Sequence, residues 1–189
     1  MNHDRFPGLR PFKETEAAIF NGRAKEIKAL FDLIMVERCV VLFAKSGAGK
    51  SSLLRAGIIP MLADLPYEPV YILLQRVEEP LLQQVCRQIS QVFGIPYQKE
   101  QTLWEYLQKI DVNTGSNIPI LIFDQFEELF TLYRQSDRQL LIRQLADVIN
   151  GTLPKSVHSQ LIHQTGPPDN ATWVTMEKAP QIKFVFAIR

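Results

Sequence analysis

Residues 44–52, AKSGAGKSS, have the types and spacing needed to hold a phosphate group. They follow the pattern G-x-x-x-x-G-K-[S/T], except that Ala44 stands where the first glycine is usual. In such a loop, backbone N–H groups at a helix N-terminus point at the phosphate, and glycines permit its close approach. Lys50 would reach the β- and γ-phosphates, and the Ser51 hydroxyl would ligate Mg²⁺. The predicted nucleotide-binding residues are Ser46, Gly47, Ala48, Gly49, Lys50, Ser51 and Ser52.

An ordinary Gly/Ser turn that happens to carry a lysine is the alternative interpretation. The complete G-K-S tail, between the apolar run CVVLF (39–43) and a predicted helix start, favours nucleotide binding. Ala44 would lie at the exit of the strand, where a small side chain suffices if φ stays negative. The alanine is therefore an allowed variant of the loop.

A second set of candidate residues follows the apolar run ILIF (120–123). Asp124 comes directly after it, as in a Walker B strand, and would hold Mg²⁺ together with Ser51, directly or through water. Hydrolysis would also need a carboxylate that orients or deprotonates a water molecule, and the candidates are Glu127 and Glu128, with Glu128 slightly preferred. The alternative is that these glutamates only complement the dipole of a helix that begins near Gln125.

The residues around Asp124 also separate the nucleotide classes. A GTPase tends to show D-x-x-G here and N-K-x-D later, but this chain has Glu127 in place of that glycine and no N-K-x-D. We therefore predict ATP with Mg²⁺ as the ligand.

The elements that must position these residues alternate along the chain. Short apolar runs without alternation predict buried strands at 39–43, 69–75, 118–123 and 182–188, and apolar spacing of three and four predicts helices between them. The predicted helices are 23–37, one from Ser51 that ends or kinks at Pro60, one from Pro80 to Gly94, one from Leu103 and one over 136–149. This alternation predicts an α/β fold, a three-layer sandwich around a mostly parallel sheet, with ligands at the carboxyl ends of the strands.

Two segments show little periodicity. Residues 1–22 are predicted to form an irregular segment pinned to the domain by the aromatic rings of FPGLRPF (6–12), and 151–180 a long loop or insertion. His158 and His163 lie in the second segment, where their spacing makes a poor metal site. The whole chain, 1–189, is predicted to be a single domain.

Composition limits the partners. The formal net charge of +1 gives no support for nucleic-acid binding, and no apolar run reaches the length of a membrane span. The two cysteines are far apart and match no metal or redox motif, and no signal peptide opens the chain. We expect a cytoplasmic protein with no membrane partner.

The motifs together resemble the P-loop domain of STAND-type signal-transduction ATPases, in particular a bacterial branch with PGLRPF and DQFEELF. They are GLRPF (8–12), FNGRAKEI (20–27), AKSGAGKSSLLRAG (44–57), TLWEYL (102–107) and DQFEELF (124–130), which span nearly the whole chain. The resemblance implies that Gly22 and Arg23 contact the nucleotide near its base or sugar. It also implies that Arg189 reads the γ-phosphate, and that catalysis involves Lys50 and Arg189 besides a glutamate.

Proteins of this kind are multidomain, ATP-dependent switches that act in regulation or defence. The resemblance therefore implies sensor and effector domains in a longer chain, a nucleotide-dependent homo-oligomer, and a sheet that continues past the fourth core strand. Two other functions stay open from the residues. One is a nucleotide-dependent protein-interaction module without appreciable hydrolysis, and the other is a DNA-acting ATPase.

Overall fold

The computed structural model describes residues 10–113, 115, 117–163 and 178–189. Its centre is a four-stranded sheet in which every neighbouring pair is parallel. The strands are β1 (Cys39–Phe43), β2 (Tyr67–Leu73), β3 (Ile118–Asp124) and β4 (Lys183–Ile188), in the order β1-β4-β3-β2. Phe43 pairs with Ile188 and Leu73 with Asp124, so the carboxyl ends of the strands lie together at one end of the sheet.

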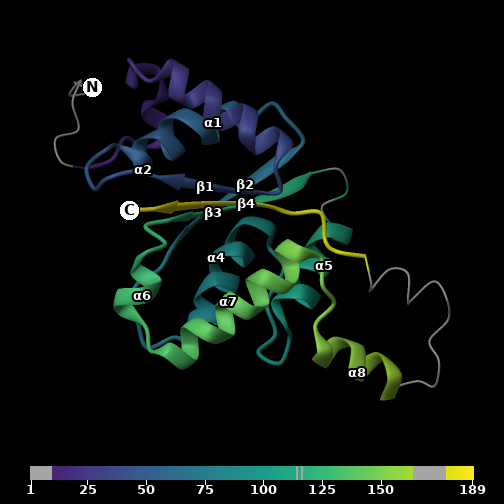
Figure 1. Cartoon of the computed structure of the whole chain (residues 1–189). Helices are drawn as coiled ribbons and strands as arrows, with labels where there is room; N and C mark the ends of the chain where they lie inside the picture. The colour runs from purple at the N-terminus through teal and green to yellow at the C-terminus, as the bar shows by residue number, and fades with distance from the viewer. Residues whose placement is uncertain (1–9, 114, 116, 164–177) are drawn as a thin grey trace.

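Helices cover both faces of the sheet, which confirms the predicted three-layer α/β fold (Figure 1). On one face lie α1 (Ala24–Val36), α2 (Lys50–Ser52), the π-helix η2 (Leu53–Ile58) and α3 (Ile59–Leu62); on the other lie α4 (Leu81–Phe93), α5 (Leu103–Asn113) and α7 (Gln135–Asn150). Each face has its own apolar cluster, because alternate side chains of a strand point to opposite faces.

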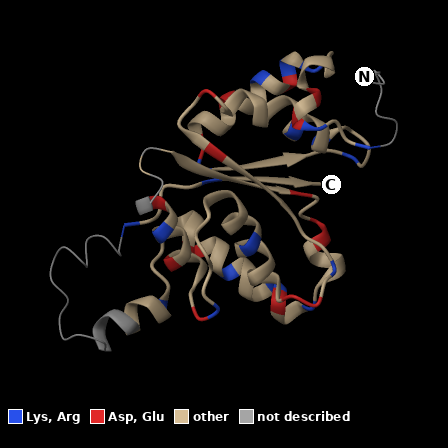
Figure 2. Ribbon diagram, turned by 180° about the vertical axis from the view of Figure 1, so that it is seen from behind, with Lys and Arg blue, Asp and Glu red and all other residues tan. Residues whose placement is uncertain are grey.

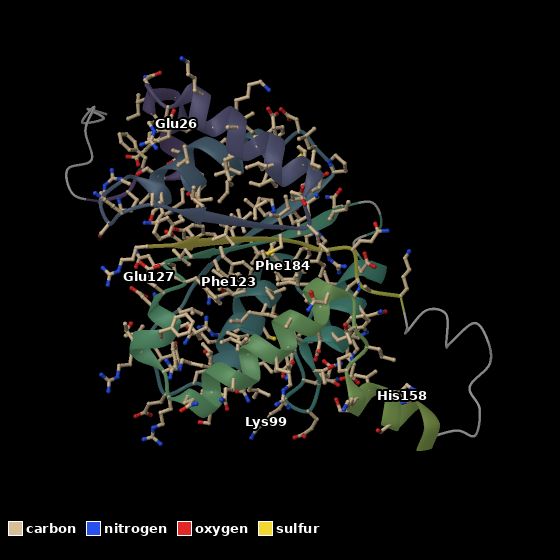
Figure 3. The ribbon with its side chains drawn as sticks, viewed as in Figure 1. Glu26, Lys99, Phe123, Glu127, His158 and Phe184 are labelled. Carbon is tan, nitrogen blue, oxygen red and sulfur yellow. The ribbon has the colours of Figure 1, made fainter. Side chains whose placement is uncertain are left out.

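The strands contain few charged residues. Figure 2 shows Lys, Arg, Asp and Glu interspersed over the helices of both layers, with the strands mostly uncharged. The side chains of Phe123 and Phe184 lie under the sheet among the helices of the second layer (Figure 3). Burial on both faces explains why the strands are continuous apolar runs in the sequence.

Two local signals in the sequence are confirmed in detail. Gly94 has a φ of 68° and ends α4 in the left-handed conformation that glycine adopts readily. Thr102 and Glu105 have the S/T-x-x-E spacing of a capping box and form one at the start of α5: the Thr102 N–H donates to Glu105 Oε2 over 2.8 Å, and the Glu105 N–H donates to Thr102 Oγ1 over 3.2 Å.

Several predicted boundaries are wrong. The second strand begins at Tyr67, two residues before its predicted start at Pro69. Proline is tolerated inside this strand because β2 is an edge strand of the described sheet. Of the predicted end or kink at Pro60, the end is wrong: the six-residue π-helix η2 precedes it and the chain continues as α3 to Leu62. Proline lacks an N–H donor, so an altered hydrogen-bonding pattern in the preceding turn is its physical consequence.

The two segments predicted to be irregular contain helices. The 3₁₀-helix η1 (Glu14–Ile19) lies within 1–22, and α8 (Lys155–His163) lies within 151–180. Both lack the long apolar periodicity on which the prediction relied. Residues 1–9 and 164–177 of these segments lie outside the described residues. Within the described part, no helix is long and apolar enough to cross a membrane.

Candidate functional site

The predicted phosphate loop connects the end of β1 to the start of α2. Gly47 and Gly49 have φ values of 77° and 80°, a conformation that other L-residues rarely adopt. Ala44 is joined to the neighbouring strand, since its N–H donates to the Ile188 carbonyl over 3.3 Å. An alanine is therefore accommodated where the pattern has glycine, because this position continues the pairing of β1 with β4.

Lys50 folds back across the loop. Its Nζ atom donates to the carbonyl oxygens of Ala44 and Lys45 over 2.8 and 3.4 Å. Both acceptors are neutral, and a phosphate oxygen is a stronger acceptor for an ammonium group. The side chain thus lies at the mouth of the loop with acceptors that an anion can replace.

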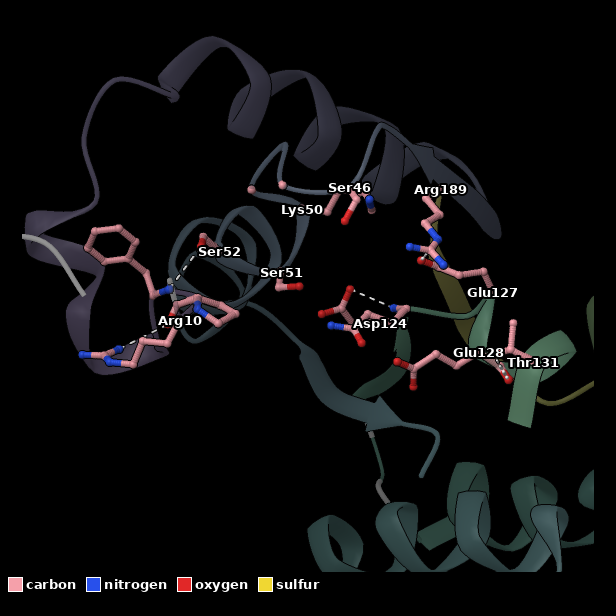
Figure 4. A pocket seen from close by; sticks show the side chains of 15 residues that line it. Arg10, Ser46, Lys50, Ser51, Ser52, Asp124, Glu127, Glu128, Thr131 and Arg189 are labelled. Atoms are coloured by element: carbon pink, nitrogen blue, oxygen red, sulfur yellow. Dashed lines mark hydrogen bonds and ion pairs between the residues drawn. The ribbon is translucent and has the colours of Figure 1, made fainter. Parts of the chain in front are cut away.

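Asp124 ends β3 and is almost completely buried, with 1% of its surface exposed. One carboxylate oxygen accepts a hydrogen bond from the Gln125 N–H over 2.9 Å, and the other accepts one from the Tyr71 hydroxyl on β2. Ser51 and Asp124 face each other across the site in Figure 4. The fold therefore brings together the two predicted magnesium ligands, which are far apart in the sequence.

A sharp turn follows Asp124. Gln125 has a φ of 53°, the left-handed conformation that costs a non-glycine residue energy, and its carbonyl accepts from the Glu128 N–H over 2.9 Å. The Phe126 N–H donates to the Ala187 carbonyl of β4 over 2.9 Å. The short helix α6 (Glu128–Leu132) begins after this turn, later than the expected start near Gln125. The turn places both glutamates beside the carboxyl ends of β3 and β4.

The two glutamates have different surroundings. Glu127 forms an ion pair with Arg189 over 3.5 Å, and its Oε2 atom is buried without a hydrogen-bond partner in the described part of the chain. The pKa of Glu128 is raised above its ordinary value, first because burial disfavours its charge and then because Glu127 and Asp124 repel it. Glu128 is directed into the cavity in Figure 4, whereas Glu127 turns toward Arg189.

These residues surround one cavity of about 520 Å³. Its walls include ten of the predicted site residues: Ser46, Gly47, Gly49, Lys50, Ser51, Ser52, Asp124, Glu127, Glu128 and Arg189. Its volume lies within the range of small-molecule and cofactor pockets, roughly 300–1,000 Å³. The loop, the acid after β3 and the arginine after β4 thus form a single site.

Three predicted residues do not line this cavity: Gly22, Arg23 and Ala48. Arg23 donates from Nη1 to the Ala48 carbonyl over 3.1 Å and is paired with Glu26 over 2.8 Å. Gly22, with a φ of 86°, forms the bend before α1. Arg23 therefore stabilises the phosphate loop through a hydrogen bond made outside the cavity. A contact of Gly22 or Arg23 with a base or sugar stays a prediction.

Five further residues line the cavity that the motifs did not identify as site residues: Arg10, Pro11, Phe12, Gln125 and Thr131. The first three belong to the FPGLRPF stretch, which was expected only to pin the N-terminal segment to the domain. The Phe12 N–H donates to Ser52 Oγ over 3.1 Å, which ties the N-terminal segment to the first turn after the loop. Arg10 forms a two-point contact with Glu16 at 2.7 and 2.5 Å and lowers the pKa of Glu16 to about 2.

The arrangement of strands, loop and acids defines a P-loop NTPase, and known structures support this fold. The chain is similar to the ORC2 protein of Aeropyrum pernix in its ADPNP–ADP complexes, with a TM-score of 0.56 at 14% identity over 97% of this chain and 43% of that one. The ADP form of the same protein gives 0.58 at 13% identity, over 97% and 44%. The Walker-type ATPase PABY2304 of Pyrococcus abyssi gives 0.55 at 15%, over 95% and 47%. The chain therefore spans less than half of each of these proteins.

The family follows from the sequence itself. Residues 6–163 match the family described as Novel STAND NTPase 1, nSTAND1, which is well over half of the chain. The chain belongs to this family of nucleotide-binding NTPases. No curated protein matches it.

The residues of the site fit a nucleotide with Mg²⁺. The positive φ angles of Gly47 and Gly49 form the cradle, Lys50 offers a cation, and the buried Asp124 carboxylate faces the Ser51 hydroxyl. Hydroxyl and carboxylate oxygens are the ligands that Mg²⁺ prefers.

Proposed function

We propose that this domain is the ATP- and Mg²⁺-binding switch module of a multidomain signalling or defence protein, reset by slow hydrolysis of ATP. The observation that carries the proposal is the single cavity shared by the phosphate loop, Asp124, Glu128 and the Glu127–Arg189 pair. A site that contacts the phosphates from three strand ends can sense whether the last phosphate is present. Contacts to that phosphate order the switch segments of other NTPases.

Each residue has a proposed role. Lys50 and the backbone N–H groups of the loop bind the phosphates, while Ser51 and Asp124 hold Mg²⁺, which neutralises charge on the phosphate oxygens. Glu128 orients a water molecule and accepts its proton, because its carboxylate is directed into the cavity and its pKa is raised. Arg189, held by Glu127, interacts with the terminal phosphate.

The choice of Glu128 over Glu127 rests on their contacts. Glu127 is occupied by Arg189, whereas no cation forms an ion pair with Glu128 among the residues that the structure describes. A carboxylate free of a cation is the better proton acceptor, since an ion pair lowers the basicity of the carboxylate.

The same proposal includes further domains on a longer chain. Sensor and effector domains on a longer chain would receive and transmit the state of the site, and nucleotide binding would control a homo-oligomer. We place the protein in the cytoplasm, where ATP and Mg²⁺ are available to it.

The test is calorimetric titration with ATP, ADP and GTP in the presence of Mg²⁺, after removal of any nucleotide that co-purifies. We expect adenine-selective binding to the wild-type chain and its loss in Lys50→Ala. Lys25→Ala is the matched control, because Lys25 is an exposed lysine on α1 that does not line the cavity. Absence of binding to a folded wild-type chain, or equal binding by Lys50→Ala, would contradict the proposal.

A further inference from the structure

Tyr71 is a neighbour of Asp124 with no role assigned so far. It lies in β2, where its backbone pairs with Ile122, while Leu73 pairs with Asp124. Tyr71 packs against the apolar cluster that contains Ile122, so it is on the face of the sheet to which Asp124 also belongs. A side chain of this length reaches the diagonal neighbour on the adjacent strand.

The Tyr71 hydroxyl contacts the carboxylate oxygen of Asp124 that a cation would ligate. Its hydroxyl donates to Oδ2, while Oδ1 accepts from the Gln125 N–H. The carboxylate oxygen that is not bonded to Gln125 is directed toward Ser51 in Figure 4. The hydroxyl of Tyr71 thus contacts Asp124, one of the two residues proposed to bind Mg²⁺, on the side that faces the other.

The position of the ring is fixed by the helical layer that covers this face of the sheet. The guanidinium of Arg55 lies 5.1 Å from the centroid of the Tyr71 ring. Arg55 is itself held by Glu14 through contacts of 2.8 and 3.1 Å. A phenol is ordinarily protonated at physiological pH, so the Tyr71 hydroxyl is a hydrogen-bond donor to the Asp124 carboxylate.

We propose that Tyr71 is a positioning residue that competes with Mg²⁺ for the Asp124 carboxylate. Its hydroxyl holds the carboxylate toward Ser51, and it gives up this hydrogen bond when a cation ligates the same oxygen. The inference rests on the proposed function and adds control of its metal-binding step. An interaction made only without the metal favours the metal-free state, so its removal shifts the equilibrium toward metal binding.

The experiment compares wild type with Tyr71→Phe, which removes only the hydroxyl. ATP binding is measured at a fixed ATP concentration over a series of Mg²⁺ concentrations. We expect the Mg²⁺ concentration at half-saturation to fall about 10- to 100-fold, as for loss of one hydrogen bond to a charged group. Tyr67→Phe is the control, since Tyr67 packs against the same cluster at the far end of β2 and should cause no shift.

A purely structural role for Tyr71 would change the unfolding temperature but not the Mg²⁺ dependence. An unchanged or higher half-saturation concentration in folded Tyr71→Phe would therefore overturn the inference while the proposed function stands. If Tyr71→Phe does not fold, Glu14→Gln, which loosens Arg55 above the ring, should shift the Mg²⁺ dependence in the same direction. No shift there would also overturn the inference, and a wild-type chain that binds no ATP would overturn both proposals.

Discussion

At the scale of single residues, neighbours in the sequence have different surroundings in the site. Glu127 and Glu128 are adjacent, yet one is paired with Arg189 and the other is directed into the cavity. The left-handed turn at Gln125 causes this difference, because it ends β3 abruptly and starts a new helix at Glu128. A pattern of two acidic residues cannot show which of them is available for chemistry.

If Glu128 is the general base, Glu128→Gln should keep ATP binding and lower turnover by about 10²- to 10⁴-fold. Its raised pKa also sets the sign of the pH dependence: the base is lost by protonation, so the acidic limb of the wild-type rate profile should lie above the ordinary glutamate value of 4.5. Steady-state phosphate release across pH measures both effects. Glu100→Gln, at an exposed and remote position, is the control.

Unchanged turnover in both Glu128→Gln and Glu127→Gln would contradict hydrolysis by this site. The domain would then fit the interaction module without appreciable turnover better than the switch reset by hydrolysis. Binding of ATP by these variants has to be measured in parallel, since a lost rate with lost binding decides nothing about the base.

At the scale of elements, the π-helix η2 depends on a close approach to α1. A Cβ atom added to Gly57 would lie 2.8 Å from Ile27 Cγ1 and 3.0 Å from its Cδ1, both closer than carbon atoms pack. Phe20, the residue that follows the 3₁₀-helix η1, packs beside the same turn, since its Cε1 would be 3.7 Å from that Cβ. The glycine therefore permits the packing of three elements behind the phosphate loop.

We expect Gly57→Ala to lower the free energy of unfolding by about 1–3 kcal/mol, the usual cost of overpacking a core. Denaturant unfolding of Gly57→Ala, Ile27→Ala and the double variant measures this. The double variant should be more stable than the sum of the single effects predicts, because Ile27→Ala removes the two atoms that clash. Strict additivity would show that the contact with Ile27 is not the cause.

The elements also show how much could be predicted from the sequence. The phosphate loop and the acid after β3 were found because each is a continuous motif beside an apolar strand, and their chemistry is contained in a few neighbouring residues. Tyr71 and Arg10 were missed because only the folded sheet and the N-terminal segment bring them to the site. The helices η1 and α8 were missed because they are short, so tertiary contacts decide their conformation.

At the scale of the whole molecule, the site connects distant parts of the chain. The loop follows β1, Asp124 ends β3 and Arg189 follows β4, so a bound nucleotide would link three strands of one sheet. Ligand contacts spread in this way stabilise the complete fold, because every contact is lost when the sheet opens.

Saturating ATP and Mg²⁺ should therefore raise the global stability. At a ligand concentration of about 100 times Kd, the expected gain is about 2.7 kcal/mol. Thermal unfolding with and without ligand measures it, and Lys50→Ala should show no gain. A wild-type chain that binds ATP but unfolds at the same temperature would contradict a site shared by these strands.

The strand order has a consequence for how the chain reaches this fold. In the described part of the sheet, β1 pairs only with β4, so Cys39 gains its partner Phe184 only after the chain between these two residues has been made. At about 5–20 residues per second, the ribosome needs on the order of ten seconds to cover that interval. During this time the phosphate loop is attached to an unpaired apolar strand. Synthesis of this domain thus passes through a vulnerable period in which β1 depends on slow, long-range pairing, and β4 joins β1 to β3 and brings Arg189 to the binding site in one step.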